Sequence, residues 1–444
     1  MEKLFMRNFS VALVALLLLA ACDNKRKGKP KGGETATTTV VFPPPDVPVE
    51  KPVVNVYIEN SGSMDGYVKG KTDFEHAVYS YLSDIKISGI ANSINLFYIN
   101  SKIIPHGSDI EDFIDKLEPT TFQKRGGNRG TTDIANVLKT VLKATNDKTV
   151  SIFVSDFVFS PGGKNKNADE YLINQQIGIK TDVAEHIKQF PQTAFTIYRL
   201  TSHFNGTYYN CYDAKTQINA RRPFFIWLIG NVDYIATLQS KIPNNNFKGS
   251  GITDSYTFLP EAHSIEYGIQ PSPKIGSFKQ SKEKGKTRTH IIEVEKADKG
   301  THKGKFMFTI GVDFTALQAL LGKEYLLDTT NYALMAKGQP SDAFTVAISE
   351  NTGTNAKYTH KIQLSTSKPI PTGDVEITLV NKEPSWIKDK NDDSGLNINA
   401  AGAMDKTYGI KYLVGGIEDA YNIVVKETKD NYQSYAKIKV NISK

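Results

Sequence analysis

The stretch VYIENSGSMDGY (residues 56–67) decides how the first half of the chain is interpreted. It begins within VVNVYI (53–58), a short β-branched run of the kind typical of a buried strand. Glu59, Ser61 and Ser63 then occupy every second position where this strand ends. Because alternate residues at a strand end leave a sheet on the same side, the hydroxyls of Ser61 and Ser63 are predicted to face one point.

Strand and helix patterns alternate over residues 53–242. Short apolar runs predict strands at 53–58, 93–107 (two strands), 149–155, 194–200 and 223–230. Helical spacing predicts helices at 72–85, 109–117, 132–144, 168–190 (broken near Gly178) and 231–242. This alternation predicts an α/β domain, with a doubly wound, mostly parallel, Rossmann-like sheet covered by helices on both faces. Ligands of such sheets bind at the carboxyl ends of the strands.

Beyond about Pro243 the helical spacing fades and the pattern becomes β-rich. Strand-like segments separated by Gly, Asn, Asp and Pro turns are THIIEVE, GKFMFTIGV, DAFTVAIS, YTHKIQLST, DVEITLV and YAKIKVNIS. We predict a β-rich domain over residues 243–345 and an Ig-like β-sandwich over residues 346–444. Short helices are expected within them at 314–322 and 411–422.

Residues 1–21 are predicted to be a lipoprotein signal peptide. A basic start precedes the apolar run VALVALLLLAA (11–21), which is too short for a typical membrane-spanning helix. Leu19-Ala20-Ala21-Cys22 resembles the lipobox of bacterial lipoproteins, which implies cleavage before Cys22 and its acylation, for example with palmitate. An ordinary signal with an incidental cysteine is the alternative. The expected location is the bacterial cell envelope, anchored by lipid, with the outer membrane favoured and the inner membrane possible.

Residues 22–52 are predicted to be a Pro- and Lys-rich tether. Its segment DNKRKGKPKGG (23–33) carries five basic residues and one acid, so it holds much of the formal net charge of +7. Beside a lipid anchor, such a basic segment indicates contact with anionic headgroups or a solvated spacer. It gives no evidence for nucleic-acid binding.

Two further stretches belong with the strand end at Glu59. RGTTDIANVL (129–138) places Thr132 in a glycine-rich loop before a helix, and IFVSDFVF (152–159) places Asp156 directly after a buried strand. In this order and these contexts, the residues resemble the metal-ion-dependent adhesion site of von Willebrand factor A (vWA) domains. The resemblance covers about residues 53–242.

The resemblance implies a metal site formed by five side chains, those of Glu59, Ser61, Ser63, Thr132 and Asp156. Mg²⁺ is the expected ion, with Mn²⁺ or Ca²⁺ as alternatives, since hard cations take oxygen ligands. The hydroxyls would bind directly, the two carboxylates mainly through water, and one coordination position would stay open for a partner's carboxylate. Family members usually carry Asp where this chain has Glu59. The longer side chain makes a site that keeps the fold but binds metal poorly the alternative.

The sequence therefore predicts a membrane-anchored binding protein, not an enzyme, that holds an acidic group of a protein partner through a divalent metal. No small-molecule substrate and no nucleic acid is expected. A metal-free scaffold of an envelope complex is one alternative. A Mg²⁺-dependent hydrolase is a weaker one, supported only by the open position on the ion. The eight histidines show no pair at metal-ligand spacing.

Three smaller features have local interpretations. Asp65 is interpreted as a turn acid or a group behind the metal ligands, with the turn favoured. Asp133 stands at a helix start, where an acid is favourable regardless of metal. HFNGTYYNCYD (203–213) is either a hairpin near the binding face or a well-packed loop, and Cys211 within it has no local signature of a nucleophile.

Overall fold

The computed structural model describes most of the chain from Glu50 onward. The described residues are 50–130, 133–162, 167–260, 265–283, 288–353, 357–428 and 434–443, without the side chains of 425–428. Residues 50–444 form one compact unit. The predicted signal peptide, Cys22, all but the last residues of the tether, and Thr132 lie outside the described residues. Within the described part, no helix is long and apolar enough to cross a membrane.

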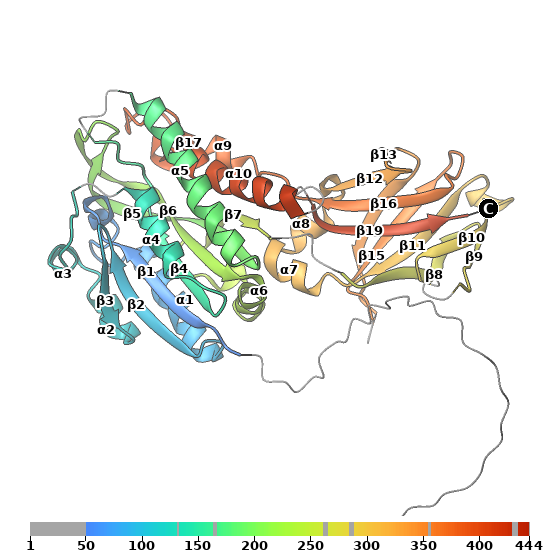
Figure 1. The fold of residues 1–444 in the computed structure, drawn as a ribbon, viewed down its shortest axis with the longest axis horizontal. Coiled ribbons are helices and arrows are strands. Elements are labelled where there is room, and N and C mark those ends of the chain that lie inside the picture. The colour runs from blue at the N-terminus through green and yellow to red at the C-terminus, as the bar shows by residue number, and fades with distance from the viewer. Residues whose placement is uncertain are drawn as a thin grey trace, which may run out of the picture. The chain divides into compact units, whose positions relative to one another are not determined.

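A seven-stranded sheet forms the centre of the first half of this unit (Figure 1). Its strand order is β3-β2-β1-β4-β6-β5-β7. The strands are β1 (Val53–Glu59), β2 (Ser93–Ile99), β3 (Ile103–Gly107), β4 (Thr149–Ser155), β5 (Thr193–Tyr209), β6 (Lys215–Asn231) and β7 (Ile252–Phe258). The α/β class is confirmed, and the sheet extends past residue 242 to include β7.

The prediction of a mostly parallel sheet is wrong. Strand β1 pairs in parallel with β2 and β4, whereas the other four pairings are antiparallel. The reason is that β5 and β6 are joined by a short turn at 210–214 instead of a helix, and a tight turn likewise joins β2 to β3. Two strands joined by a tight turn pair antiparallel, because a parallel connection needs a crossover of a dozen or more residues.

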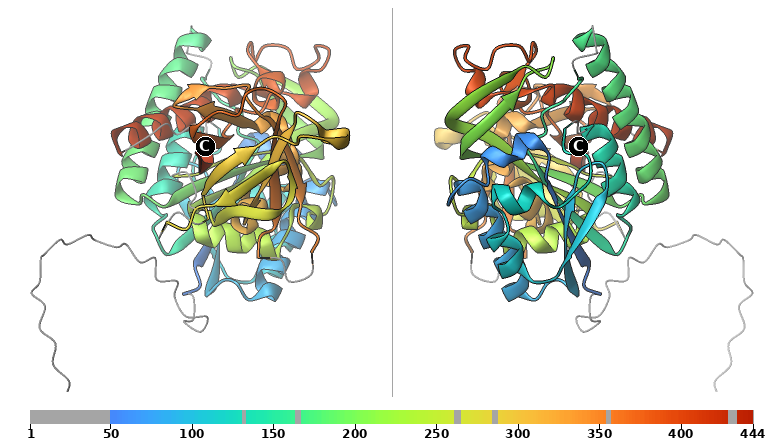
Figure 2. Two further views of the ribbon diagram at one scale, coloured as in Figure 1. Left: turned by 90° about the vertical axis from the view of Figure 1, so that its right-hand side faces the viewer. Right: turned by 90° about the vertical axis from the view of Figure 1, so that its left-hand side faces the viewer.

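Helices cover both faces of this sheet (Figures 1 and 2). They are α1 (Asp73–Ser88), α2 (Ile110–Asp115), α3 (Pro119–Gln123), α4 (Ile134–Lys143), α5 (Ala168–Gln189) and α6 (Val232–Lys241). Side chains of β6 show why both faces are covered. Phe224, Ile226 and Leu228 enter the core with α1 and α6, whereas their neighbours Phe225 and Trp227 enter the core with α4 and α5. Period-two alternation of large apolar residues thus supplies two cores.

A helix from the end of the chain completes one face. Helix α10 (Ile410–Thr428) lies beside α5, which is unbroken at Gly178 (Figure 1). A Cβ on Gly416 of α10 would lie 2.8 Å from the carbonyl oxygen of Gln176, so the close contact of the helices requires glycine there. The hydroxyl of Tyr421 donates a 2.7 Å hydrogen bond to the Thr193 carbonyl at the start of β5. The predicted helix at 411–422 therefore belongs to the α/β part.

Two further sheets share a core in the second half of the unit. A six-stranded sheet has the order β13-β12-β16-β19-β10-β9, and a four-stranded sheet has the order β14-β15-β11-β8. The strands are β8 (Tyr267–Ile275), β9 (Ser277–Gln280), β10 (His290–Glu295), β11 (Phe306–Val312), β12 (Tyr332–Ala336), β13 (Gln339–Pro340), β14 (Thr345–Glu350), β15 (His360–Thr366), β16 (Gly373–Val380) and β19 (Ser434–Ile442). All pairings are antiparallel except β10 with β19.

The predicted boundary at 345/346 does not separate these sheets. Strand β11 pairs with β15, and β12 pairs with β16, so segments from both sides of the boundary share each sheet. The short helices α7 (Thr315–Leu321) and α8 (Lys323–Leu327) lie between strands, as expected for 314–322.

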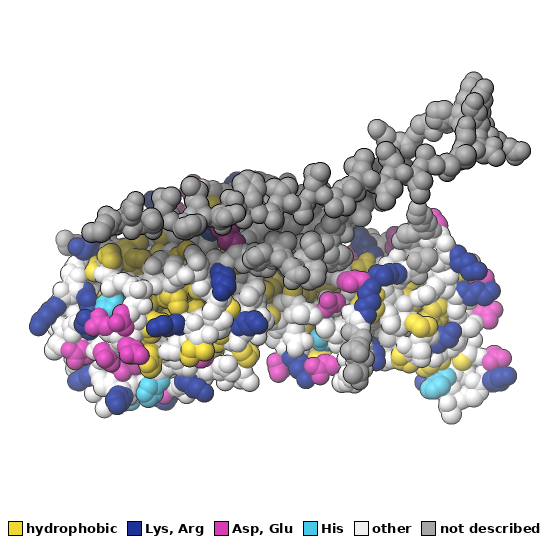
Figure 3. Space-filling view, turned by 90° about the horizontal axis from the view of Figure 1, so that it is seen from below, with side chains coloured by type: hydrophobic (Ala, Val, Ile, Leu, Met, Phe, Trp, Pro, Cys, Tyr) yellow, Lys and Arg dark blue, Asp and Glu magenta, His cyan; other side chains and the backbone are white. Residues whose placement is uncertain are grey.

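On the face drawn in Figure 3, described basic and acidic side chains are interspersed, which is the pattern of an ordinary solvated surface.

Between β16 and α10 the chain returns to the seven-stranded sheet. Helix α9 (Trp386–Asp389) places the Trp386 indole N–H 3.2 Å from the Ser255 carbonyl of β7. Residues 391–409 follow, and we call them the arch. The arch begins and ends with the paired two-residue strands β17 (Asn391–Asp392) and β18 (Thr407–Tyr408). It lies against the ends of β5 and β6, next to the predicted site.

Candidate functional site

The site begins where β1 and β4 end side by side. Glu59 is the last residue of β1 and is only 3% exposed. Its carboxylate accepts a hydrogen bond from the hydroxyl of Ser155, the last residue of β4. Because β1 and β4 are parallel neighbours, their carboxyl ends meet at one edge of the sheet. The predicted convergence of the two strand ends is therefore present.

The two serines lie together in the loop after β1. Their Oγ atoms are 2.9 Å apart, with Ser61 buried and Ser63 half-buried at the start of a short 3-10 turn, η1 (Gly62–Gly66). Arg129 holds this loop in place. Its guanidinium donates to the Ser61 carbonyl at 3.2 Å and forms an ion pair with Asp65. Asp65 therefore pairs with the same arginine that binds the serine loop.

Asp156 reaches the serines from the buried side. It follows β4 directly and is 4% exposed. Its carboxylate accepts hydrogen bonds from the Val158 backbone N–H, at 3.2 Å, and from the Ser63 hydroxyl. Burial raises the pKa of the Asp156 carboxyl, while the Val158 N–H, the positive charge of Arg222 and the Ser63 hydroxyl act in the opposite direction.

The backbone after Asp156 is strained and held by packing. Phe157 has φ of +50°, in the left-handed region that bulky residues rarely adopt. Its N–H donates to the Ser155 hydroxyl at 2.8 Å, and its ring stacks on Trp227 with centroids 4.3 Å apart. Such strain persists only where the surroundings fix it. In this chain the strained residue Phe157 lies in the turn that directs the Asp156 carboxylate toward Ser63.

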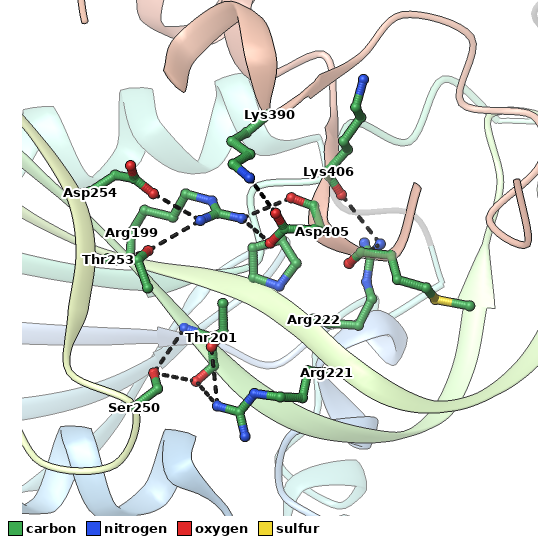
Figure 4. A network of polar contacts seen from close by, with 12 residues as sticks. Arg199, Thr201, Arg221, Arg222, Ser250, Thr253, Asp254, Lys390, Asp405 and Lys406 are labelled. Carbon is green, nitrogen blue, oxygen red and sulfur yellow. Dashed lines mark hydrogen bonds and ion pairs between the residues drawn. The ribbon is translucent and has the colours of Figure 1, made fainter. Parts of the chain in front are cut away.

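Arg222 of β6 supplies a buried positive charge that no motif in the sequence marks. It is 2% exposed, and its guanidinium lies over the Tyr208 ring, 4.9 Å from the centroid. It donates to three carbonyl oxygens of the arch, at Ala403 (3.4 Å), Met404 (3.4 Å) and Lys406 (3.2 Å) (Figure 4). Because its charge also acts on Asp156, Arg222 couples the candidate site to the arch.

Arg199 of β5 provides a second buried anchor for the arch (Figure 4). Its guanidinium pairs with Asp254 of β7 at 2.9 Å and with Asp405 of the arch at 2.5 Å. Lys390 also pairs with Asp405, at 2.5 Å. Buried charges are stable when paired and hydrogen-bonded, so these contacts fix the arch against the sheet.

A pocket of about 270 Å³ opens at this edge of the sheet. Of the predicted residues, Glu59, Ser61 and Ser63 line it, while Asp156 lies behind and reaches Ser63. The remaining lining residues are Gly62, Arg129, Gly130, Val158, Ser160, Tyr209, Asp213 and Lys215. Small-molecule sites usually measure roughly 300–1,000 Å³, so this pocket has the size for an inserted side chain.

The segment 203–213 belongs to a hairpin next to this pocket. Of the two interpretations of this segment, the hairpin is therefore the correct one. The two 17-residue strands β5 and β6 extend far past the core segments at 194–200 and 223–230. The hairpin crosses closely over η1, since a Cβ on Gly206 would lie only 2.7 Å from the Gly66 Cα. It brings Tyr209, Asp213 and Lys215 to the pocket, which a strand pattern alone does not reveal.

The predicted site offers oxygen donors, which are the type of ligand that a hard cation takes. The Ser61 and Ser63 hydroxyls form a hydrogen bond of 2.9 Å with each other. Adjacent ligands of an octahedral Mg²⁺ with bonds of roughly 2.0–2.1 Å lie at a similar distance of about 2.8–3.0 Å. Asp156 adds a carboxylate hydrogen-bonded to one of these hydroxyls. Among the described residues, no group of three His, Cys, Asp or Glu side chains forms a metal site. The predicted set contains only two such residues and relies on hydroxyls.

No protein-family model matches the chain, and no curated protein sequence matches it significantly. The protein has a mixed α/β sheet with a pocket at the carboxyl ends of β1 and β4, followed by antiparallel β-sheets.

Proposed function

We propose that the protein binds an acidic group of a partner protein through a divalent cation, Mg²⁺ or Mn²⁺, at the pocket beside Ser61 and Ser63. The observation that carries this proposal is the pair of hydroxyl oxygens 2.9 Å apart, with Asp156 hydrogen-bonded to one of them. In this proposal Ser61 and Ser63 hold the ion, and Thr132 contributes from the neighbouring loop.

The donor set favours binding over catalysis. A bound divalent cation would supply a concentrated positive charge that attracts an anionic ligand. Neutral hydroxyls would leave most of that charge uncompensated, while Glu59 and Asp156 would balance it from behind. Asp156 is held by the Val158 N–H and Ser63, and Glu59 by the Ser155 hydroxyl, so both carboxylates are oriented before a ligand arrives.

The proposal includes a vWA-like identity for the α/β part. The parallel strands β2, β1 and β4, the helices on both faces and the position of the site support it. The antiparallel strands β6, β5 and β7 set this chain apart from a mostly parallel sheet. An Ig-like character of the second half and a lipid anchor at Cys22 in a bacterial envelope complete the proposal.

Isothermal titration of the wild-type protein with MgCl₂ and MnCl₂ tests the metal site. We expect binding heat in the wild type and its loss in the double variant Ser61→Ala/Ser63→Ala. The matched control is Ser349→Ala/Ser367→Ala, which changes two exposed serines, one in β14 and one directly after β15. Thermal melts of all three proteins establish that each is folded. Equal heats in wild type and the site variant, or no heat in either, contradict the proposal.

A metal-free scaffold is the second candidate, and Arg222 favours it. Its buried guanidinium already provides a positive charge near Asp156, as a cation would. In that case partner association persists in EDTA, whereas the metal-dependent function requires that EDTA abolish it. Pull-down from native membranes with and without the chelator distinguishes the two.

A further inference from the structure

The turn of the β5–β6 hairpin forms one wall of the pocket. We call residues 209–215 the hairpin tip. Three of its side chains, Tyr209, Asp213 and Lys215, line the pocket together with the loop that carries the serines. The wall therefore comes from a segment about 150 residues after Ser61 and Ser63 in the sequence.

Hydrogen bonds within the turn and to the arch hold the hairpin tip. The Asn210 side-chain oxygen accepts hydrogen bonds from the backbone N–H groups of Tyr212 and Ala214, both at 2.9 Å. The arch supports the tip from outside, since the Cys211 N–H donates to the Gly395 carbonyl at 3.0 Å. A side chain on this tip is thus presented to the pocket from a fixed backbone.

Tyr209 covers the serine loop. Its hydroxyl lies 3.5 Å from the position that a Cβ on Gly62 would take, and Gly62 is the residue between the two serines. The Lys215 ammonium lies 5.8 Å from the centroid of the Tyr209 ring. The phenol and the ammonium therefore lie together beside the hydroxyls of Ser61 and Ser63.

Of the two described cations that line the pocket, Lys215 is the one without a described ion pair. The other cation that lines the pocket, Arg129, is already paired with Asp65 and with loop carbonyls. Lys215 is exposed and, among the described residues, forms no ion pair. An exposed ammonium over a polar pocket indicates an anionic ligand.

We propose that Lys215 and Tyr209 are specificity-determining residues, which read a carboxylate side chain of the partner at the pocket mouth. This inference rests on the proposed function and adds to it a second contact that does not depend on metal. Lys215 pairs with the carboxylate, and the Tyr209 hydroxyl donates to it. The exposed side chain of Tyr212, next to Asp213 on the same tip, continues this surface toward the partner.

A singly charged carboxylate fits the charges of the pocket better than a phosphate. Glu59 and Asp213 line the pocket together with Arg129 and Lys215, so its walls carry both signs. A dianionic phosphate would face two acids at short range, and like charges in contact are unfavourable. The size of about 270 Å³ also suits one acidic side chain.

The test uses the peptide acetyl-Gly-Asp-Gly-amide, followed by ligand-observed NMR in Mg²⁺ and in EDTA. The same peptide with Asn in place of Asp removes the negative charge, and the peptide with phosphoserine in place of Asp adds one. We expect Lys215→Met to weaken binding of the Asp peptide about threefold to tenfold, and Tyr209→Phe to weaken it less. The matched control is Lys274→Met, because Lys274 is also exposed and lies over an aromatic ring, 5.0 Å from the Phe278 centroid, in the β-sheets.

The outcomes separate this inference from the proposed function. Loss of peptide affinity in Lys215→Met, with Mg²⁺ titration heats equal to the wild type, supports the role of the hairpin tip. Peptide affinity unchanged in Lys215→Met overturns it, even where the ion binds. Lys215-dependent peptide binding without any cation heat supports the tip and overturns the metal site. Equal binding of the Asn peptide, or tighter binding of the phosphoserine peptide, overturns the assignment of a carboxylate.

Discussion

Arg222 and Asp156 are both buried at one end of the central sheet, and the guanidinium charge acts on the carboxyl group. Each is less than 5% exposed, and the positive charge of Arg222 lowers the pKa of Asp156 against the effect of burial. The same guanidinium donates to carbonyls at both ends of the segment 403–406. The Arg222 side chain thus offsets the negative charge of Asp156 and also holds the arch in place.

Replacing Arg222 by Met should destabilise the fold. The variant leaves Asp156 without its nearby charge and three arch carbonyls without their donor. Removing one partner of a buried charged group usually costs about 3–5 kcal/mol. Because the Asp156 carboxyl can bind a proton instead, we expect about 3 kcal/mol, measured by urea unfolding at pH 7.

The control for Arg222→Met is Arg288→Met, whose pair with Glu266 is exposed. Exposed pairs contribute about 0–1 kcal/mol, so this variant should unfold like the wild type. If the metal site exists, Mg²⁺ should stabilise Arg222→Met more than the wild type, because a competing positive charge is gone. An Arg222→Met protein as stable as Arg288→Met contradicts the coupling of Arg222 to the site and the arch.

A methyl group at Gly206 should loosen the hairpin from the serine loop. The added Cβ would meet the Gly66 Cα at 2.7 Å, which is backbone and moves only with the whole turn. Overpacking of this kind costs about 1–3 kcal/mol. We expect Gly206→Ala to lower the unfolding free energy by that amount in urea titrations and to weaken cation binding as well.

Gly178→Ala is the matched control for Gly206→Ala. Gly178 lies in the interior of α5, with no atom within 4 Å of the added methyl group. An alanine there should stabilise the helix by roughly 0.5–1 kcal/mol. Opposite signs in the two variants establish the close crossing of hairpin and loop, whereas a stabilising Gly206→Ala contradicts it.

Local patterns were sufficient for most elements of the fold. The predicted helix at 72–85 is α1, Asp73–Ser88, and the predicted strand at 149–155 is β4, Thr149–Ser155. Both depend on spacing within a single segment, which side-chain periodicity records. The ends of β1 and β4 also lie together, as the resemblance to a vWA site implied, although strand alternation alone does not say which strands are neighbours.

Contacts between distant segments were not predictable. Helix α10 packs on α5 through Gly416 and Gln176, which are 240 residues apart in sequence, and no single segment carries a signal for that contact. Arg222 precedes an apolar strand and looks like an ordinary solvated cation in the sequence. Its burial follows from the arch and from Tyr208, which are contacts that the sequence does not show. The missed parts of the site therefore come from tertiary packing.

Cys22 should carry the membrane anchor. If the lipobox resemblance is correct, cells expressing the wild-type protein incorporate labelled palmitate into it, and the protein partitions into detergent. We expect Cys22→Ser to lose both the label and the partitioning, since acyl chains supply the membrane affinity. Cys211→Ser is the control, because that thiol is buried in the α/β core. A label retained in Cys22→Ser contradicts the lipid anchor.

His186 should make the fold sensitive to acid. Its ring is buried on α5 against Phe190, with centroids 5.1 Å apart, and burial lowers its pKa to about 4. In the unfolded chain the pKa is about 6.5. Between these values the unfolded chain binds a proton that the folded chain does not, so the unfolding free energy falls as pH falls from about 6.5 to 4. A shift of this size corresponds to roughly 3 kcal/mol at the acid end.

Urea unfolding at pH 7, 5.5 and 4.5 measures this effect. The unfolding free energy should decrease less with falling pH in His186→Leu than in the wild type or in the exposed-site control His302→Leu. If His186→Leu shows the same pH dependence as the wild type, other groups cause the acid sensitivity.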